Sequence, residues 1–377
     1  MFIVDLLIFV FILGLVVLVH ELGHFLAAKI SKVKVEEFGI GFPPKIWRKK
    51  IGETEYSIGA IPLGGYNKIY GMDELDEEKD KDPKSYESKG IFAKMFITLG
   101  GVITGLLFAV AIFYFLVIGS GFQTSQVLIN SNFKFPLGTQ ENHPFIVGVD
   151  SGSPAAAAGI QSKDVILSVN GQNMANADQF IAEVSANVGK DISVSYLDVN
   201  VNQVKTADIV PRAPTADAGP LGVSLGDMAF IKYQTITDKI LCGFMHTFNF
   251  VDYSFVALGD IVVNSIQTKS TEPLASSLTG PVGIFAITKV VTKEGIIPVI
   301  NFVALLSIAL AISNLLPLPA LDGAKFIYII LQSINKRVFS KALEMKIEQA
   351  GLAFLILLAI AIIFKDFFQF KSIIFGS

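Results

Sequence analysis

Four long apolar segments constrain the fold of this chain more than any other feature of its sequence. They run from Phe2 to about Ala27, from Met95 to Ile118, from Ile296 to Leu316 and from Gly351 to Phe364. A helix of roughly 20 apolar residues crosses the hydrocarbon core of a bilayer; the fourth segment does so only if it extends backward. Hydrophobic residues make up 52% of the chain and charged residues 17%, against about 25% charged residues in soluble proteins. The pattern predicts a helical membrane protein with about four spans.

Positive charge in the short loops predicts how these spans are oriented. Residues 29–50 are rich in Lys and Arg, and a second basic group lies between the third and fourth spans: Lys325, Lys336, Arg337, Lys341 and Lys346. Because basic residues concentrate in cytoplasmic loops, we expect both loops inside, and both termini and the 119–295 segment outside. The first segment lacks the features of a cleaved secretory signal and is expected to remain as a helix.

The 119–295 segment is water-soluble in composition and predicts an inserted α+β domain. Apolar and polar residues alternate in its middle part, and Asn170-Gly171 is a strong hairpin turn signal. Ser153, followed by proline, predicts the N-cap of a short helix. Residues 236–266 are aromatic-rich and too polar to span, which suits helices that lie at the membrane surface.

These patterns give an expected organisation along the chain. We expect a first transmembrane helix at 1–30, a cytoplasmic or membrane-reentrant β-rich segment and loop at 31–94, a second transmembrane helix at 95–118, an α+β domain at 120–225, an interfacial amphipathic helical region at 226–295, a third transmembrane segment at 296–324, and a cytoplasmic loop with a fourth transmembrane helix at 325–377. The net charge is −3, and no basic stripe with interleaved aromatic residues predicts nucleic-acid binding.

The sequence His20-Glu21-Leu-Gly-His24 lies at the end of the first apolar segment. Ionisable groups are costly in that position and are usually functional. Two histidines four residues apart share one face of a helix and can bind zinc, and the glutamate after the first can act as a general base. The alternative is that these are polar residues at a helix end near the membrane surface.

A catalytic zinc usually has three protein ligands, so two histidines leave the site one short. Cys242 is the only cysteine in the chain. His143 falls in the outside domain and His246 in the interfacial stretch, and we expect both to be surface or hydrogen-bonded residues.

Asp322 is the best remaining donor. It follows the third span, whose helix is broken by Pro317 and Pro319 before the acid and its following glycine. Spans one and three both enter from outside, and His20 lies about 27 Å along its helix from Phe2, so both motifs fall near the inner ends of their spans. The alternative for Asp322 is a helix-capping or turn role.

Together these motifs resemble the site-2 proteases, zinc metalloproteases that cut within membranes, and in particular the bacterial regulator of sigma-E protease type. The resemblance rests on HELGHF at 20–25, the glycine-rich 52–71 segment, a PDZ-like 145–200, LTGPVGI at 278–284 and NLLPLPALDG at 314–323. It implies an α-helical polytopic membrane protein with a membrane-associated β-hairpin or sheet and one inserted extracytoplasmic PDZ-like domain.

The resemblance also implies roles for single residues. His20, His24 and Asp322 are implied to bind Zn²⁺, Glu21 to be the catalytic base, and Asn314 to help position substrate. The chain departs from the family pattern in the second span, where Gly101 to Gly105 stand in place of a Gly-Pro-x-x-Asn motif, and Thr104 is a candidate to replace that asparagine. Ala324 also follows Gly323 where the family usually has a second glycine.

The expected function is an intramembrane zinc metalloendopeptidase. It would cleave single-pass membrane proteins, such as anti-sigma factors or remnant signal peptides already trimmed by another protease, in a bacterial inner membrane with the active site toward the cytoplasm. The 52–70 segment could hold substrate as an added strand, or be an ordinary hairpin. Two other functions stay open: a catalytically idle membrane scaffold that binds partners through its PDZ-like domain, and a membrane-tethered protease for soluble substrates.

Overall fold

The computed structural model describes the chain except for residues 1, 74–75, 200, 216–217, 336–338 and 376–377. Lys336 and Arg337 of the second basic loop therefore lie outside the described residues. The chain divides into two compact units. Unit 1 comprises 1–116, 246–254 and 258–377, and unit 2 comprises 117–245 and 255–257.

Four helices in the described part of the chain are long and apolar enough to cross a membrane: α1 (Phe2–Ile30), α4 (Gly100–Gly119), α10 (Ile296–Leu315) and α12 (Lys341–Phe375). These helices match the four expected segments. The second segment differs at its start, because Leu99 separates α4 from a short helix, α3 (Ile91–Thr98). The fourth is longer than expected, since a polar first part continues into the apolar run.

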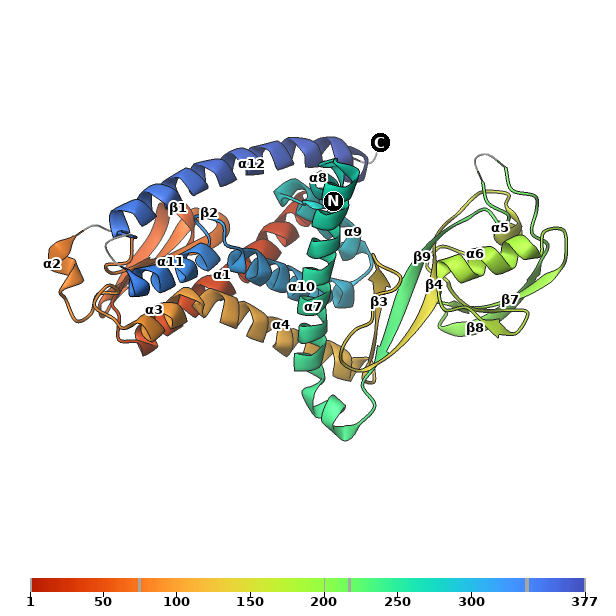
Figure 1. Ribbon diagram of the computed structural model, residues 1–377, viewed down its shortest axis with the longest axis horizontal. Helices are drawn as coiled ribbons and strands as arrows, with labels where there is room; N and C mark the ends of the chain where they lie inside the picture. The colour runs from red at the N-terminus through yellow and green to blue at the C-terminus, as the bar shows by residue number, and fades with distance from the viewer. Residues whose placement is uncertain (1, 74–75, 200, 216–217, 336–338, 376–377) are drawn as a thin grey trace. The chain divides into compact units, whose positions relative to one another are not determined.

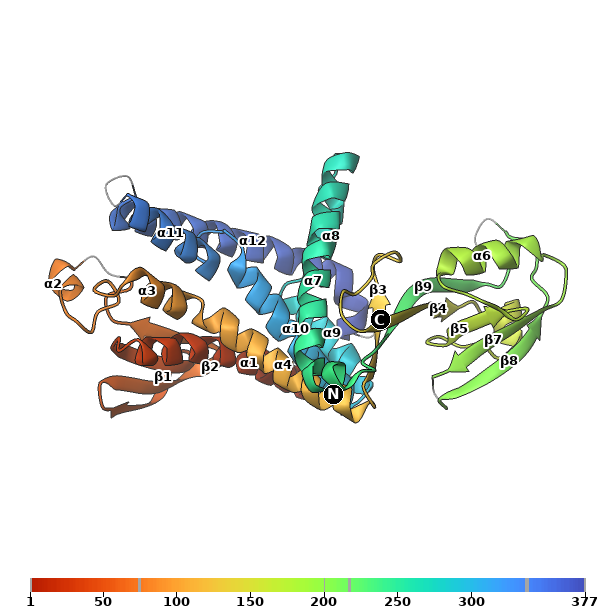
Figure 2. The same cartoon turned by 60° about the horizontal axis from the view of Figure 1, so that its bottom comes forward.

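The remaining helices are shorter or more polar. They are α2 (Glu77–Asp80), α5 (Pro154–Ala157), α6 (Ala177–Ala186), α7 (Ile236–Thr268), α8 (Glu272–Ser277), α9 (Pro281–Lys293) and α11 (Asp322–Ile334). Figure 1 and Figure 2 show α1, α4 and α10 running side by side in unit 1.

Close contact between α1 and α4 depends on glycine. A Cβ atom on Gly23 would lie 2.1 Å from the Gly100 carbonyl oxygen, a separation that real atoms do not reach. The two backbones can therefore approach only because Gly23 has no side chain, as is common where helices pack in membranes. Ser307 of α10 adds a polar contact by donating to the Gly105 carbonyl at 2.9 Å.

A long antiparallel hairpin lies beside the second half of α1 (Figure 1 and Figure 2). It consists of β1 (Val35–Ile51) and β2 (Thr54–Ile69). Residues 37–40 of β1 pair with 65–68 on one side and with 55–58 on the other, because both strands of the hairpin bend back on themselves. The hairpin is thus a small twisted sheet. Phe38 fixes it to the helix, with its ring 5.0 Å from the Phe25 ring of α1.

Unit 2 is built on an antiparallel sheet with the strand order β3-β9-β4-β5-β7-β8, and β6 pairs with β5. Its strands are β3 (Gln123–Leu128), β4 (Thr139–Val149), β5 (Val165–Val169), β6 (Gln172–Asn173), β7 (Ile192–Asp198), β8 (Gln203–Ile209) and β9 (Val223–Lys232). Its core is apolar and includes Ile146, Ile166 and Phe180.

The local turn signals of unit 2 are confirmed. Asn170 and Gly171 have φ values of 50° and 80°, as a tight hairpin turn between β5 and β6 requires. Ser153 caps α5, with its hydroxyl oxygen accepting from the Ala156 amide. The expected domain end at residue 225 is wrong, since it falls inside β9. The alternating pattern after Pro214 is too weak to reveal a strand whose partners are distant in sequence.

Candidate metal centre

Three side chains from two distant parts of the sequence converge beside the C-terminal half of α1. His20 Nε2 and His24 Nε2 lie 3.2 Å apart. Asp322 Oδ2 lies 3.3 Å from each of these nitrogens. The two histidines are buried, and the Asp322 side chain is only 16% exposed. The spacing of four residues on one helix face accounts for the histidine pair, and the start of α11 supplies the carboxylate.

A hydrogen bond from Nδ1 of His24 orients the imidazole ring so that Nε2 faces the cluster. His24 Nδ1 lies 2.9 Å from the carbonyl oxygen of Ile97 in α3. A carbonyl oxygen can only accept a hydrogen bond, so Nδ1 carries the hydrogen. Nε2 is then left with a free lone pair, which faces His20 Nε2 and Asp322 Oδ2. Metal-binding histidines are commonly oriented by such a bond from their other nitrogen.

The three atoms fit a zinc ion. Tetrahedral ligands about 2.0 Å from Zn²⁺ are about 3.3 Å from one another, which matches the observed separations. Asp322 Oδ2 is also buried without a hydrogen-bond partner in the described part of the chain. A buried carboxylate oxygen is costly without a partner, so this atom indicates a site built for a cation. The three groups form the one cluster of metal-ligating side chains found among the described residues.

The break between α10 and α11 places Asp322. α10 ends at Leu315 and α11 begins at Asp322, so the expected interruption by Pro317 and Pro319 is present. Gly323 is required at this turn, because a Cβ atom there would lie 2.3 Å from the Leu315 carbonyl oxygen. The tight turn thus brings the carboxylate back toward the histidines of α1.

Gly101 closes one side of the cluster, and sequence reasoning did not identify it. A Cβ atom at this position would lie 2.5 Å from His24 Nε2 and 2.5 Å from His20 Cε1. Any side chain here would therefore enter the space between the donors. The signals in the sequence were the glycine-rich start of the second span and the place of Gly101 at the start of the stretch that replaces the Gly-Pro-x-x-Asn motif.

Glu21 lies beside the metal donors and is held by a residue that the sequence did not predict. Asn67 of β2 donates from Nδ2 to Glu21 Oε2 at 2.7 Å and to the Glu21 carbonyl oxygen at 2.6 Å. Gly65 of the same strand passes close to the glutamate, because a Cβ atom there would lie 3.6 Å from Glu21 Cγ. The β hairpin therefore contributes directly to the surroundings of Glu21.

The other candidate residues occupy different surroundings. Asn314 donates to the Leu310 carbonyl of its own helix at 3.0 Å. Thr104 hydrogen-bonds backbone carbonyls of its own helix and of Val19 in α1. His143 lies on β4 beside the Phe230 ring, and His246 packs against aromatic rings in unit 1. None of these four is part of the described His20, His24 and Asp322 cluster.

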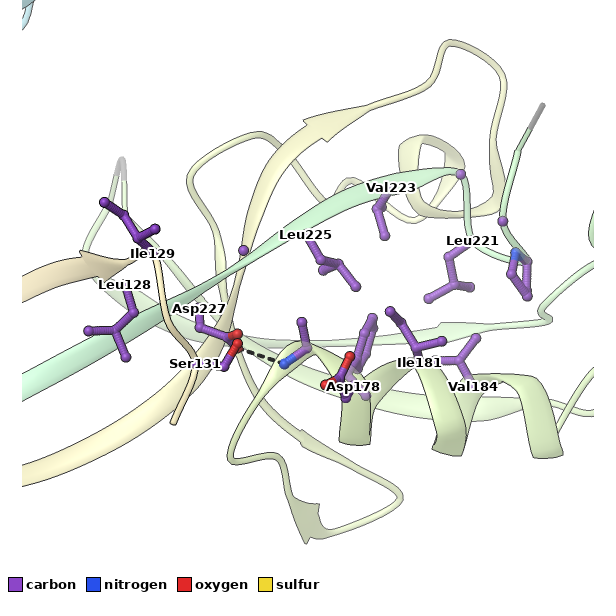
Figure 3. A pocket seen from close by; sticks show the side chains of 16 residues that line it. Leu128, Ile129, Ser131, Asp178, Ile181, Val184, Leu221, Val223, Leu225 and Asp227 are labelled. Carbon is purple, nitrogen blue, oxygen red and sulfur yellow. Dashed lines mark hydrogen bonds between the residues drawn. The ribbon is translucent and has the colours of Figure 1, made fainter. Parts of the chain in front are cut away.

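Unit 2 carries a second candidate site, a groove of about 590 Å³ between α6 and β9. Figure 3 shows Leu221, Val223 and Leu225 facing Ile181 and Val184 of α6. β9 pairs with β4 over its whole length, but with β3 only from Asp227 to Lys232. Along Val223–Gly226 one strand edge therefore has no strand partner in the described sheet.

The fold and the donor set define a class: a helical membrane protein with a His-x-x-x-His pair and an aspartate that could hold a metal ion. The sequence profile of peptidase family M50 matches residues 8–358, and the chain belongs to this family, that of the site-2 proteases.

Relatives cover nearly the whole chain. One from Helicobacter pylori is 31% identical over 376 residues, covering 95% of this chain and 97% of the relative. One from Clostridium perfringens is 30% identical over 351 residues, covering 93% and 94%. The names of both assign them to the zinc metalloproteases. A solved PDZ domain of Listeria monocytogenes aligns with 22% of this chain and 86% of its own, at 24% identity and a TM-score of 0.20.

Proposed function

We propose that this protein is an intramembrane zinc metalloendopeptidase that hydrolyses peptide bonds in the transmembrane segments of single-pass proteins. The observation that carries the proposal is the convergence of His20, His24 and Asp322 beside the C-terminal half of an apolar helix. Membership of a peptidase family and relatives named as zinc metalloproteases support the same reaction.

In this proposal His20, His24 and Asp322 hold Zn²⁺. When bound, zinc activates water for attack and polarises the carbonyl of the scissile peptide. Glu21 then takes the proton from the attacking water and delivers it to the leaving amine. Its position next to His20 and one turn before His24 puts the carboxylate beside the metal donors.

Substrate must be extended before it is cut, because a helix shields its peptide bonds with its own hydrogen bonds. We propose that the β1–β2 hairpin accepts the substrate as an added strand, and that Asn314 helps to position its backbone. The substrate class is anti-sigma factors or remnant signal peptides that another protease has trimmed, in regulated intramembrane proteolysis.

Unit 2 is proposed to be a PDZ-like recognition module or size filter. The unpaired edge at Val223–Gly226 and the apolar groove beside it support binding of an extended peptide. We propose a location in the bacterial inner membrane, with both termini and unit 2 extracytoplasmic and the active site toward the cytoplasm. The basic loops after α1 and before α12 support this orientation.

The test is Glu21→Gln in the full-length protein. We expect zinc to remain bound at one ion per chain while cleavage of a model transmembrane substrate disappears, because glutamine cannot accept the proton. Undiminished cleavage would overturn the mechanism. Purified wild-type protein without stoichiometric zinc would instead favour a catalytically idle scaffold, so metal analysis is run on both proteins.

A further inference from the structure

The side chain of Asn67 makes two hydrogen bonds to Glu21 that the packing of the hairpin does not require. Both hydrogens of its amide are used on one residue: one bond goes to the Glu21 carbonyl oxygen at 2.6 Å and one to Glu21 Oε2 at 2.7 Å. The two bonds link the main chain and the side chain of Glu21 through a single nitrogen. The carboxylate cannot turn to another rotamer without breaking one of them.

The other end of the same amide is also informative. Asn67 Oδ1 is buried and has no hydrogen-bond partner within the described residues. An unpaired buried acceptor costs about 1–3 kcal/mol. Asparagine at this strand position therefore carries a free-energy cost that an apolar residue would not carry. The two bonds to Glu21 are the compensating contacts that the structure shows.

The strand that carries Asn67 is itself held firmly against α1. Asn67 pairs with Phe38 in the sheet, and the Phe38 ring packs on Phe25, one helical turn after Glu21. On the preceding residue, the Tyr66 hydroxyl donates to Glu37 Oε1 at 2.5 Å, and Ser57 donates to the same oxygen at 2.8 Å. The amide is thus presented to Glu21 from a strand that these contacts hold within the hairpin and against α1.

We propose that Asn67 is a positioning residue that fixes the orientation of the Glu21 carboxylate beside the metal centre. Its bond occupies Oε2 and leaves Oε1 for the proton of the attacking water. This inference rests on the proposed role of Glu21 as general base. It assigns a specific task to the β hairpin in addition to holding substrate, since the strand also holds the base of the reaction.

The experiment compares three substitutions in the full-length protein. Asn67→Leu keeps the size and removes both donors, Asn67→Asp places a carboxylate against Glu21, and Asn67→Gln keeps the amide on a longer side chain. Zinc content, kcat and KM for a model transmembrane substrate are measured for each. Asn173→Asp, at an exposed position of β6 in unit 2, makes the same change of amide to carboxylate as a matched control.

We expect Asn67→Leu to lower kcat by about tenfold and Asn67→Asp by up to about a hundredfold, the range typical of residues that orient catalytic groups. KM should stay within about threefold and zinc at one ion per chain, because neither substrate contacts nor metal ligands are changed. Asn67→Gln should recover part of kcat, and Asn173→Asp should behave as wild type.

The Glu21 and Asn67 variants together separate this inference from the proposed function. If Glu21→Gln abolishes cleavage but Asn67→Leu and Asn67→Asp keep wild-type kcat, Asn67 has no positioning role. Loss of zinc or of folded protein in all three Asn67 variants would also overturn the inference, since it would assign Asn67 to the fold. Cleavage that survives Glu21→Gln would refute the proposed function itself.

Discussion

Two buried histidine environments in unit 1 differ in every respect that matters for chemistry. His20 and His24 point their Nε2 atoms at each other and at a carboxylate, and a backbone carbonyl orients the His24 ring. His246 of α7 is equally buried, but its ring packs edge-on against Phe113 at 4.6 Å and Phe250 at 4.9 Å between ring centroids. Burial of a histidine in a membrane protein is therefore not a sign of metal binding. The feature that favours metal binding is the convergence of several ligand atoms, as at His20, His24 and Asp322.

The largest expected effect comes from removing one donor of the cluster. His24→Ala or Asp322→Asn should abolish stoichiometric zinc and lower cleavage by more than about a hundredfold, because two ligands do not complete a catalytic site. His143→Ala should keep both zinc and activity. Metal analysis of the purified variants checks the result, and full zinc occupancy in His24→Ala would contradict the assignment.

Gly101→Ala should have the next largest effect. The added methyl group would lie 2.5 Å from both imidazoles and force the rings apart. We expect zinc affinity and cleavage to fall by about tenfold or more. Gly105→Ala on the same helix is the control, since its nearest neighbour atom would be 3.5 Å away, an ordinary contact. Equal zinc affinity in the two variants would show that Gly101 does not shape the centre.

His246→Leu should leave zinc and cleavage unchanged. At pH 7 it should lower the free energy of unfolding by about 1 kcal/mol through lost ring contacts. Burial lowers the pKa of His246 to about 3. The unfolded chain takes up this proton below about pH 6.5 while the folded chain does not, so the wild type loses stability as pH falls from about 6.5 toward 3. The leucine variant lacks this contribution, and the stability difference should shrink with falling pH. A pH-independent difference in denaturant titrations would argue against it.

The sequence predicts the spans well because a bilayer imposes a minimum apolar length that can be read directly from the chain. It predicts His20, Glu21 and His24 because their spacing on one helix is local. Asp322 could be inferred as the best remaining donor after the broken third span, from matching depths in two spans, and from the resemblance carried by NLLPLPALDG. The break at Leu99 and the full extent of β9 to Lys232 were missed, because neither gives a local sequence pattern strong enough to detect.

Asn67 and Gly101 could not be predicted for a different reason. Their importance comes from what lies opposite them in the fold: a glutamate 46 residues away for Asn67, and two imidazoles of another helix for Gly101. An asparagine in a strand or a glycine in an apolar helix has no sequence signal that distinguishes it from a bend or a packing site. Only the three-dimensional structure assigns such supporting residues.

The pairing of β3 with only the second half of β9 sets a length scale in unit 2. The unpaired edge comprises four residues, Val223 to Gly226, which corresponds to about 13 Å of extended chain. A strand that paired there in register would meet the end of β3 at Leu128 after that distance. If the groove takes an added strand as proposed, the edge has room to pair with about four residues, and β3 would stop a longer strand from pairing further along β9.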